Sequence, residues 1–110
     1  MLVEAGRQAK GAVKALCQAL QDKDQDVRWH AIQALGEIGP DAKDAVPELI
    51  KALKAQEDDI RLFAADALGK IGPAAKPAIP ALGECARSDP EPGNRKVAKL
   101  AIRRIKGEIN

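Results

Sequence analysis

Aromatic residues are almost absent from this sequence. Trp29 and Phe63 are the only two, and there is no tyrosine. Sheet proteins rely on aromatic and β-branched side chains, whereas closely packed helices can be built from alanine, leucine, isoleucine and valine. Because 45% of the residues are nevertheless hydrophobic, small aliphatic side chains must form the core. The composition favours one all-α domain, for which 110 residues are enough.

Residues that carry metal or nucleophilic chemistry are also scarce. His30 is the single histidine, and Cys17 and Cys85 are the only cysteines, so a zinc cluster of cysteine and histidine ligands is excluded. Neither a Walker loop nor a nucleophile elbow occurs in the sequence. We therefore expect a protein that is not an enzyme, with no catalytic residue, no metal site and no cofactor.

Net charge and long apolar runs are missing as well. The 18 basic and 16 acidic residues nearly cancel at +2, so the global charge identifies no partner. No apolar run has the length of a membrane span, and the N-terminal MLVEAGRQAK lacks the apolar stretch of a signal peptide. We expect a cytoplasmic protein that does not bind membranes.

What the sequence does contain is a tandem repeat. Residues 24–53 recur as residues 57–86 after a shift of 33 positions, and both copies hold the pattern ALGxIGP. Arg28 falls on Arg61, and most other positions are identical or similar. A period of this length is typical of a helical solenoid.

The repeat divides the chain into four parts within a single domain, 1–110. They are a partial repeat 1–22, full repeats 23–55 and 56–88, and a divergent capping helix 94–107. Leu2 and Gly6 stand where Leu35 and Gly39 stand one repeat later, so the chain is expected to open inside a repeat, with the end of one helix followed by a whole second helix.

Apolar spacing and Gly-Pro signals predict six helices stacked as hairpins in a short α-solenoid. Their ranges are about 8–21, one that ends at Gly39-Pro40, then about 41–55, 58–71, 76–87 and 94–107. Pro47 lies early in its helix, where a kink or a 3₁₀ first turn is expected.

The predicted apolar faces include two groups of residues. One helix buries Val27, Ala31, Ala34, Leu35 and Ile38, and the last helix buries Val97, Leu100, Ala101 and Ile105. Residues 88–94 are interpreted as a loop about four residues longer than the earlier junction. In that register Ala98 replaces the repeated arginine.

The pattern DxDVRxxAxxALGxIGP followed by AVPxL resembles the HEAT repeat, and more narrowly the HEAT-like repeats of the phycobilisome-lyase type. The resemblance covers nearly the whole chain and is strongest over 24–86. It implies a right-handed α-α superhelix whose second helices line a concave side, and a role as a binding scaffold.

Some proteins with similar repeats are enzymes, and the resemblance allows those branches to be compared. Deoxyhypusine hydroxylase holds two irons with His-Glu pairs, but here Ala31 follows His30, which excludes that branch. Alkylpurine DNA glycosylases use a longer array with a catalytic aspartate and aromatic residues, and bilin lyases normally have many more repeats. A role as accessory subunit of a bilin lyase stays a weaker alternative.

Charges recur once per repeat, as Asp26 with Arg28 and as Asp59 with Arg61. They could form a series of ligand-binding charges. We favour a structural interpretation, in which the aspartate caps a helix and the arginine bridges neighbouring repeats. Cys17 and Cys85 are placed two helical layers apart, so we expect free and mostly buried thiols.

Positions that differ between copies and face away from the core are the best partner contacts, because a solenoid keeps its packing residues and varies its binding surface. On the concave side these are Lys14, Gln18, Gln21, Glu48, Lys51, Lys54, Ala81, Glu84 and Arg87. The preferred hypothesis is a scaffold that binds a protein or peptide through them. Self-association through incomplete terminal repeats is also expected.

The last helix offers an alternative site. Its basic face consists of Arg95, Lys96, Lys99, Arg103 and Lys106. Five cations on one face could bind phosphates of a nucleic-acid backbone or another anionic surface. They could equally be a solvated cap whose late cations complement the helix dipole, and we favour the cap.

Overall fold

Helices make up most of the chain in the computed structural model, which describes the backbone of residues 2–109 and the side-chain surroundings of residues 10–109. Helical residues form four uninterrupted stretches, 2–19, 25–52, 58–88 and 92–105, and no strand occurs within residues 2–109. The all-α class is confirmed, whereas the expectation of six separate helices is corrected to four helical stretches. The side chain of Leu2, expected to match Leu35, lies outside the described part.

Two of these stretches share one internal order, an α-helix, a 3₁₀ turn and a second α-helix. The elements are α1 (Leu2–Ala19), α2 (Gln25–Ile38), η1 (Gly39–Ala45), α3 (Val46–Ala52), α4 (Asp58–Ile71), η2 (Gly72–Ala78), α5 (Ile79–Ser88) and α6 (Pro92–Ile105). The order α2, η1, α3 thus recurs as α4, η2, α5, as a tandem repeat requires.

Two glycines turn the chain from the first to the second helix of each repeat. Gly39 has a φ of 74° and Gly72 a φ of 80°, and their N–H groups donate to the carbonyls of Leu35 and Leu68. Side chains disfavour a positive φ, so glycine is the residue that fits here. The expected stop at Gly-Pro and the expected 3₁₀ turn at the start of the second helix are both confirmed.

The first helix differs from the expectation. Helix α1 runs without a break from Leu2 to Ala19, so a helix end at Gly6, at the place of Gly39, is wrong. Arg7 follows Gly6 where Pro40 follows Gly39. Arginine keeps the backbone N–H that proline lacks, and the helical hydrogen bonds can continue.

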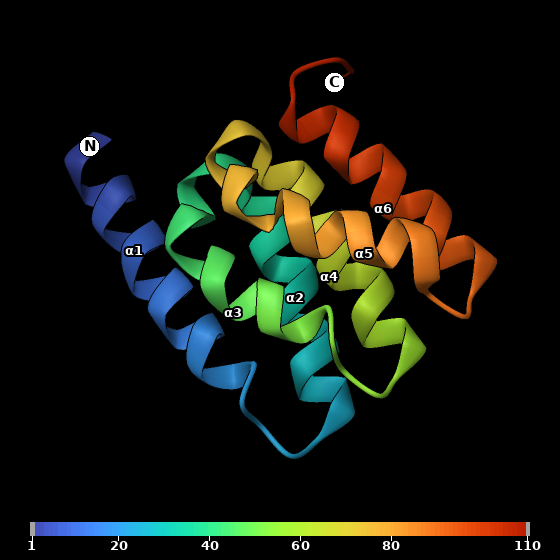
Figure 1. The fold of residues 1–110 in the computed structure, drawn as a ribbon. Helices are drawn as coiled ribbons and strands as arrows, with labels where there is room; N and C mark the ends of the chain where they lie inside the picture. The colour runs from blue at the N-terminus through green and yellow to red at the C-terminus, as the bar shows by residue number, and fades with distance from the viewer. Residues whose placement is uncertain (1, 110) are drawn as a thin grey trace.

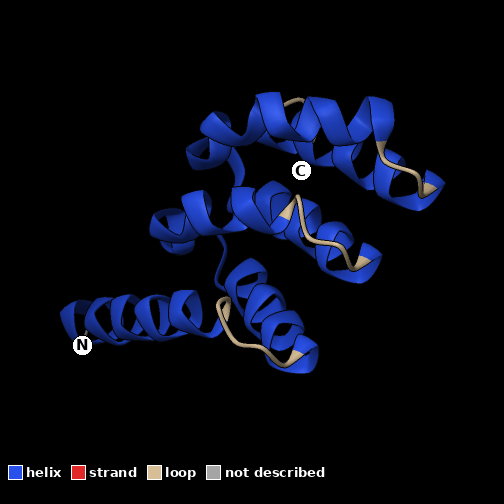
Figure 2. Cartoon of the chain, turned by 60° about the horizontal axis from the view of Figure 1, so that its bottom comes forward, coloured by secondary structure: helices blue, strands red, loops and turns tan. Residues whose placement is uncertain are grey.

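The helices form two rows. Helices α2, α4 and α6 pack against one another in chain order, while α1, α3 and α5 form the second row (Figure 1). The molecule measures 43 × 35 × 17 Å, and its thinnest dimension matches two layers of packed helices. The inter-repeat loops 20–24, 53–57 and 89–91 lie at the same side of the stack (Figure 2).

Leucine and isoleucine side chains fill the space between the rows. Those that are fully buried are Ile32, Leu35, Leu49, Ile60, Leu68, Ile71, Leu82 and Ile105. Of the residues expected on the buried faces, Ala34, Ile38 and Val97 are only half-buried. Val27 and Leu100 are each 37% exposed. Val27 lies on α2 and Leu100 on α6, which are the first and last helices of the row α2, α4, α6. Each of these two helices has a neighbour in the row on one side only, which leaves the other side exposed.

Two further glycines allow the helices of the first row to approach closely. A Cβ atom at Gly36 would lie 3.3 Å from the Cα of Ala67, and a Cβ at Gly69 would lie 3.0 Å from the Cα of Ala101. Real Cβ atoms seldom come this near to backbone. The glycine of the repeated ALG pattern is therefore a packing residue at the contacts of α2 with α4 and of α4 with α6.

The register of α6 corrects a second expectation. The starts of α2 and α4, Gln25 and Asp58, are 33 residues apart, and the start of α6 at Pro92 comes 34 residues after Asp58. The start of α6 is therefore displaced by one residue from the period of 33. The loop 89–91 has three residues where 53–57 has five, so the expected loop about four residues longer is wrong. The reason is that the helix begins with a proline that can occupy its first turn.

In this register Arg95, not Ala98, corresponds to Arg61. The Nη1 of Arg61 donates to the carbonyls of residues 55 and 56 at 3.0 and 2.8 Å. The Nη1 of Arg95 donates to the carbonyls of Asp89 and Pro90 at 2.6 and 3.4 Å. The expected loss of the repeated arginine in the last helix is therefore wrong, and Ala98 is a buried core residue.

Candidate functional site

The nine predicted contact residues lie on the row formed by α1, α3 and α5 and on the turns that follow α1 and α3. Glu48 and Ala81 are half-buried, and the other seven are exposed: Lys14, Gln18, Gln21, Lys51, Lys54, Glu84 and Arg87. We call these nine residues the second-helix surface. The structure brings six of them together in two groups, one around Glu48 and one around Ala81, and it leaves Lys14, Gln18 and Arg87 outside both.

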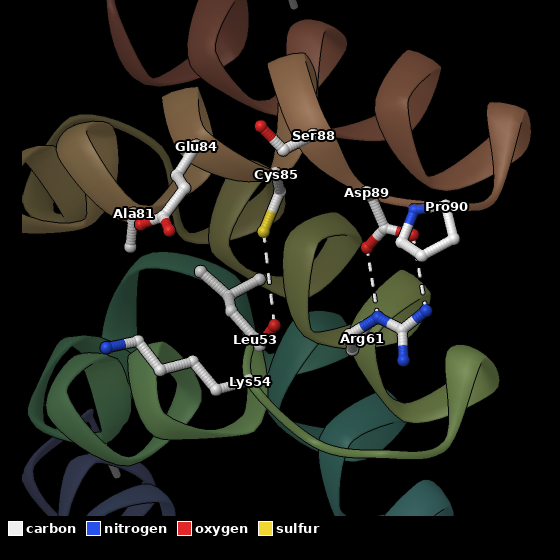
Figure 3. A pocket seen from close by; sticks show the side chains of 9 residues that line it. All are labelled: Leu53, Lys54, Arg61, Ala81, Glu84, Cys85, Ser88, Asp89 and Pro90. Atoms are coloured by element: carbon white, nitrogen blue, oxygen red, sulfur yellow. Dashed lines mark hydrogen bonds and ion pairs between the residues drawn. The ribbon is translucent and has the colours of Figure 1, made fainter.

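The group around Ala81 borders a pocket of about 390 Å³ between the end of α3 and helix α5 (Figure 3). Its lining residues are Leu53, Lys54, Arg61, Ala81, Glu84, Cys85, Ser88, Asp89 and Pro90. We call it the Cys85 pocket. Pockets that bind small molecules usually measure about 300–1,000 Å³, so this pocket is large enough to hold a ligand group.

The group around Glu48 borders a second, smaller pocket of about 200 Å³, one repeat earlier. Its lining residues are Leu20, Gln21, Arg28, Ile32, Glu48, Lys51, Ala52, Ala55 and Ile60. We call it the Gln21 pocket. A shift of 33 positions places most of these residues on the lining of the Cys85 pocket. The two pockets are copies of one inter-repeat space.

The mouth of the Gln21 pocket is crossed by a hydrogen bond. The Nε2 of Gln21 donates to the Oε2 of Glu48 at 2.6 Å, and the Nζ of Lys51 lies 3.4 Å from the Oε1. The carboxylate of Glu48 thus accepts a hydrogen bond from Gln21 at one oxygen and pairs with Lys51 at the other. This pair links the turn after α1 to helix α3 and narrows the entrance.

The Cys85 pocket lacks this crossing. Lys54 stands at the position of Gln21 and Ala81 at the position of Glu48, so no carboxylate faces Lys54 from that position. Glu84 stands where Lys51 stands in the other copy. Neither Lys54 nor Glu84 takes part in an ion pair within residues 10–109. The mouth therefore stays open and carries one charge of each sign.

An ion pair forms one wall of the Cys85 pocket. The Nε and Nη2 of Arg61 donate to the two carboxylate oxygens of Asp89 at 2.9 and 3.2 Å, and the side chain of Asp89 is 4% exposed. Burial by itself would raise the pKa of Asp89, but the hydrogen bonds from Arg61 and from the Glu91 N–H bring it below its ordinary value. The pair is internally neutral and leaves no free charge in the wall.

The same bridge occurs one repeat earlier. Arg28 donates to both carboxylate oxygens of Glu57 at 3.2 and 2.6 Å, and this hydrogen bond lowers the pKa of Glu57. The prediction that the repeated arginine bridges neighbouring repeats is confirmed. The prediction that Asp26 and Asp59 cap their helices is wrong, because both lie inside the first helical turn and Asp24 and Glu57 occupy the N-cap positions.

The thiol of Cys85 lies inside the pocket, with its Sγ 3.9 Å from the carbonyl oxygen of Leu53 (Figure 3). Burial raises its pKa, and the nearby carboxylates of Asp89 and Glu84 raise it further. Only the thiolate is a good nucleophile, so this thiol acts as an apolar wall group at neutral pH. Cys17 and Cys85 are free, as expected, although each is half-buried and not fully buried.

The described residues offer neither a metal site nor a membrane-spanning helix. Within residues 10–109 no three histidine, cysteine, aspartate or glutamate side chains gather closely enough to hold a metal ion. None of the helices from α1 to α6 combines the length and the apolar character that crossing a membrane requires.

The basic face of α6 is smaller than predicted. Lys96, Lys99, Arg103 and Lys106 are exposed, but Arg95 is half-buried and binds loop carbonyls. Arg103 also lies 3.8 Å from the carboxylate of Glu108. Three lysines therefore remain on this face without an ion pair within the described residues.

Some residues of the Cys85 pocket were not predicted as site residues from the sequence. They are Leu53, Arg61, Cys85, Ser88, Asp89 and Pro90. A signal was present in the two copies of the repeat, because Cys85 and Ser88 stand where the first copy has Ala52 and Ala55. Asp89 could not be found this way, since it lies in the junction where the two copies no longer align.

Comparison with known proteins supports the repeat assignment. A family model described as HEAT repeats matches residues 5–43 and 13–103, which together span most of the chain. A search of curated proteins found no match. The family match concerns HEAT repeats in general, and the narrower resemblance to the phycobilisome-lyase type stays a hypothesis.

Proposed function

The chain belongs to the HEAT-repeat family, and we propose that it is a non-enzymatic scaffold that binds a protein or peptide through the second-helix surface. HEAT repeats commonly serve in protein interaction. In this proposal α1, α3 and α5 line the concave side of a right-handed superhelix, and the protein acts in the cytoplasm. The observation that carries the proposal is the open Cys85 pocket, which lies on that surface between the end of α3 and helix α5.

The differences between the two repeats support a binding role. Core and turn residues are nearly the same in both copies, whereas Glu48 is replaced by Ala81 and Lys51 by Glu84. These positions contribute little to the core, so their chemistry can change without loss of the fold. A surface that varies on a constant framework is expected where a solenoid recognises its partner.

The test is a charge reversal on the second-helix surface. Lys51→Glu combined with Glu84→Lys leaves the net charge unchanged and should abolish most partner capture in a quantitative pull-down. The matched control is the double variant Glu37→Lys on α2 and Lys99→Glu on α6, two exposed positions outside the second-helix surface. It also leaves the net charge unchanged and should capture as the unmodified protein does. Circular dichroism melts should show that both variants stay folded. Equal capture by both double variants would contradict the proposal.

A second candidate function is binding of a nucleic-acid backbone by α6. The specific observation in its favour is the single exposed face that holds Lys96, Lys99 and Lys106. Counterion release predicts a steep loss of affinity with salt, with a slope of about −0.9 per phosphate contact. Titration with duplex and single-stranded DNA at low and moderate salt tests this, and no binding at low salt would eliminate it.

A further inference from the structure

We propose that the Cys85 pocket receives an aliphatic side chain of a peptide segment, with an acidic residue on one side for Lys54 and a basic residue on the other for Glu84. This inference rests on the proposed scaffold function and specifies the chemistry of its partner. It follows from the difference between the Cys85 pocket and its copy, the Gln21 pocket.

The inner surface of the pocket is chiefly apolar. Leu53 is 3% exposed, and Ala81, Cys85 and Pro90 add methyl, thiol and ring surface. The thiol is protonated at neutral pH because burial raises its pKa. The charged groups of the wall, Arg61 and Asp89, already satisfy each other. An aliphatic side chain can therefore enter without leaving a buried charge unpaired.

The rim of the pocket carries two charges of opposite sign, those of Lys54 and Glu84, and neither forms an ion pair within residues 10–109. In the Gln21 pocket the carboxylate of Glu48 accepts from a neighbour on each side. Ala81 removes that carboxylate from the Cys85 pocket, and no carboxylate within residues 10–109 pairs with Lys54, so an acidic group of a partner can pair with it. Glu84 in turn faces solvent where the other copy has Lys51.

These two charges decide the class of ligand. A simple anion would approach Lys54 but would also meet the carboxylate of Glu84, and a simple cation would meet Lys54. A peptide with one charge of each sign avoids both repulsions. In an extended peptide, side chains two positions apart share a face, so an acidic, an aliphatic and a basic residue at alternate positions can reach the three sites.

The size of the space agrees with an inserted side chain. The Gln21 pocket, at about 200 Å³, is half as large and has a crossed mouth, while the Cys85 pocket measures about 390 Å³. The partner is therefore expected to anchor in one inter-repeat space and not in its copy.

The thiol in the pocket provides the readout. Cys85 is alkylated by iodoacetamide in the presence of a capped peptide with the sequence EALAK, and the reaction at each cysteine is followed by mass spectrometry. Cys17, on α1, is the internal control because it lies outside the pocket. At a peptide concentration of twice the Kd, alkylation of Cys85 should slow about threefold, since protection follows 1 + [L]/Kd. The rate at Cys17 should not change.

Two control peptides separate the parts of the proposal. The peptide EAAAK lacks the aliphatic anchor, and QALAQ lacks both charges. Each should protect Cys85 less than EALAK does. Equal protection by EAAAK would overturn the aliphatic anchor, and equal protection by QALAQ would overturn the role of Lys54 and Glu84. Unchanged alkylation with EALAK would overturn the whole inference.

A double variant can introduce into the Cys85 pocket the hydrogen bond that crosses the entrance of the Gln21 pocket, and so close it. Lys54→Gln with Ala81→Glu reproduces the Gln21–Glu48 pair and should remove the protection of Cys85 while the circular dichroism melt stays the same. Persistent protection would contradict the inference. If this variant still captures the partner while the Lys51 and Glu84 reversal does not, the pocket inference fails and the scaffold function stands. If the reversal leaves capture intact but EALAK protects Cys85, the scaffold proposal fails instead.

Discussion

Arg61 and Asp89 form a two-point ion pair that joins α4 to the loop before α6, with donor–acceptor distances of 2.9 and 3.2 Å. Arg61 also holds the preceding loop by donating to two carbonyls at 2.8 and 3.0 Å. The guanidinium of Arg61 thus binds both loops that flank the second full repeat, 53–57 and 89–91. It also makes a wall of the Cys85 pocket, so the stability of the stack and the shape of the site depend on the same contact.

Removing Asp89 should therefore destabilise the protein strongly. Asp89→Ala leaves the guanidinium of Arg61, 14% exposed, without its carboxylate, and breaking such a pair costs about 3 kcal/mol. Chemical denaturation followed by circular dichroism measures the loss. The control is Glu57→Ala at the equivalent bridge, where the carboxylate is 30% exposed, and its effect should be smaller. Equal losses in the two variants would contradict this account.

The same pair predicts a dependence on pH. Although burial opposes it, the hydrogen bonds from Arg61 and the Glu91 N–H lower the pKa of Asp89 in the folded protein. A lowered pKa adds stability above the unfolded-state pKa of about 3.9, and that stability is lost as the pH falls toward the folded-state pKa. The free energy of unfolding, measured from pH 6 down to acid, should fall less steeply in Asp89→Asn than in the unmodified protein. Parallel curves would rule this out.

Gly69 should not tolerate a side chain. Gly69→Ala would place a Cβ 3.0 Å from the Cα of Ala101, and such overpacking of two helices costs about 1–3 kcal/mol, against a gain of up to about 1 kcal/mol in helix propensity. The matched control is Gly11→Ala on α1, whose Cβ would meet nothing within 4 Å. That variant should be stabilised by up to about 1 kcal/mol. Thermal melts of the two variants that shift in the same direction would contradict the prediction.

Arg95 should behave as a structural residue and not as part of a charged face. Its Nη1 donates to the carbonyls of Asp89 and Pro90, and hydrogen bonds from a charged donor contribute about 1.5–3 kcal/mol. Arg95→Ala should lower the free energy of unfolding by about 1.5 kcal/mol, whereas the exposed Lys99→Ala should change it by less than about 0.5 kcal/mol. Denaturation curves that coincide for the two variants would show that Arg95 is only solvated.

Local signals predicted the fold well where the repeat is regular. The Gly-Pro steps at Gly39 and Gly72 require a positive φ and a proline without an N–H, so each indicates a helix end regardless of its surroundings. The same reasoning failed at Gly6, because the glycine has no proline after it and a helix can pass through a lone glycine at a cost of about 1 kcal/mol.

The start of α6 and the Cys85 pocket were harder to predict. The two prolines in residues 88–94 indicate a loop, but Pro92 is equally suited to the first turn of a helix, and only tertiary packing decides between them. Because α6 begins at Pro92, the position that corresponds to Arg61 is Arg95 and not Ala98. The pocket depends on which side chains cross the space between repeats, and a bond such as Gln21–Glu48 has no local sequence signature.

The two thiols offer a final prediction about the electrostatics of the second-helix surface. Burial raises the pKa of both cysteines, and carboxylates raise it further: those of Asp89 and Glu84 at Cys85, and those of Glu48 and Asp44 at Cys17. Since alkylation requires the thiolate, Glu84→Gln should speed the reaction at Cys85 and leave Cys17 unchanged, and Glu48→Gln should do the reverse. Iodoacetamide rates for each cysteine, measured by mass spectrometry at pH 8, test this crossed pattern. If either substitution speeds both thiols equally, the effect is a general loosening of the fold, and the local charge explanation is wrong.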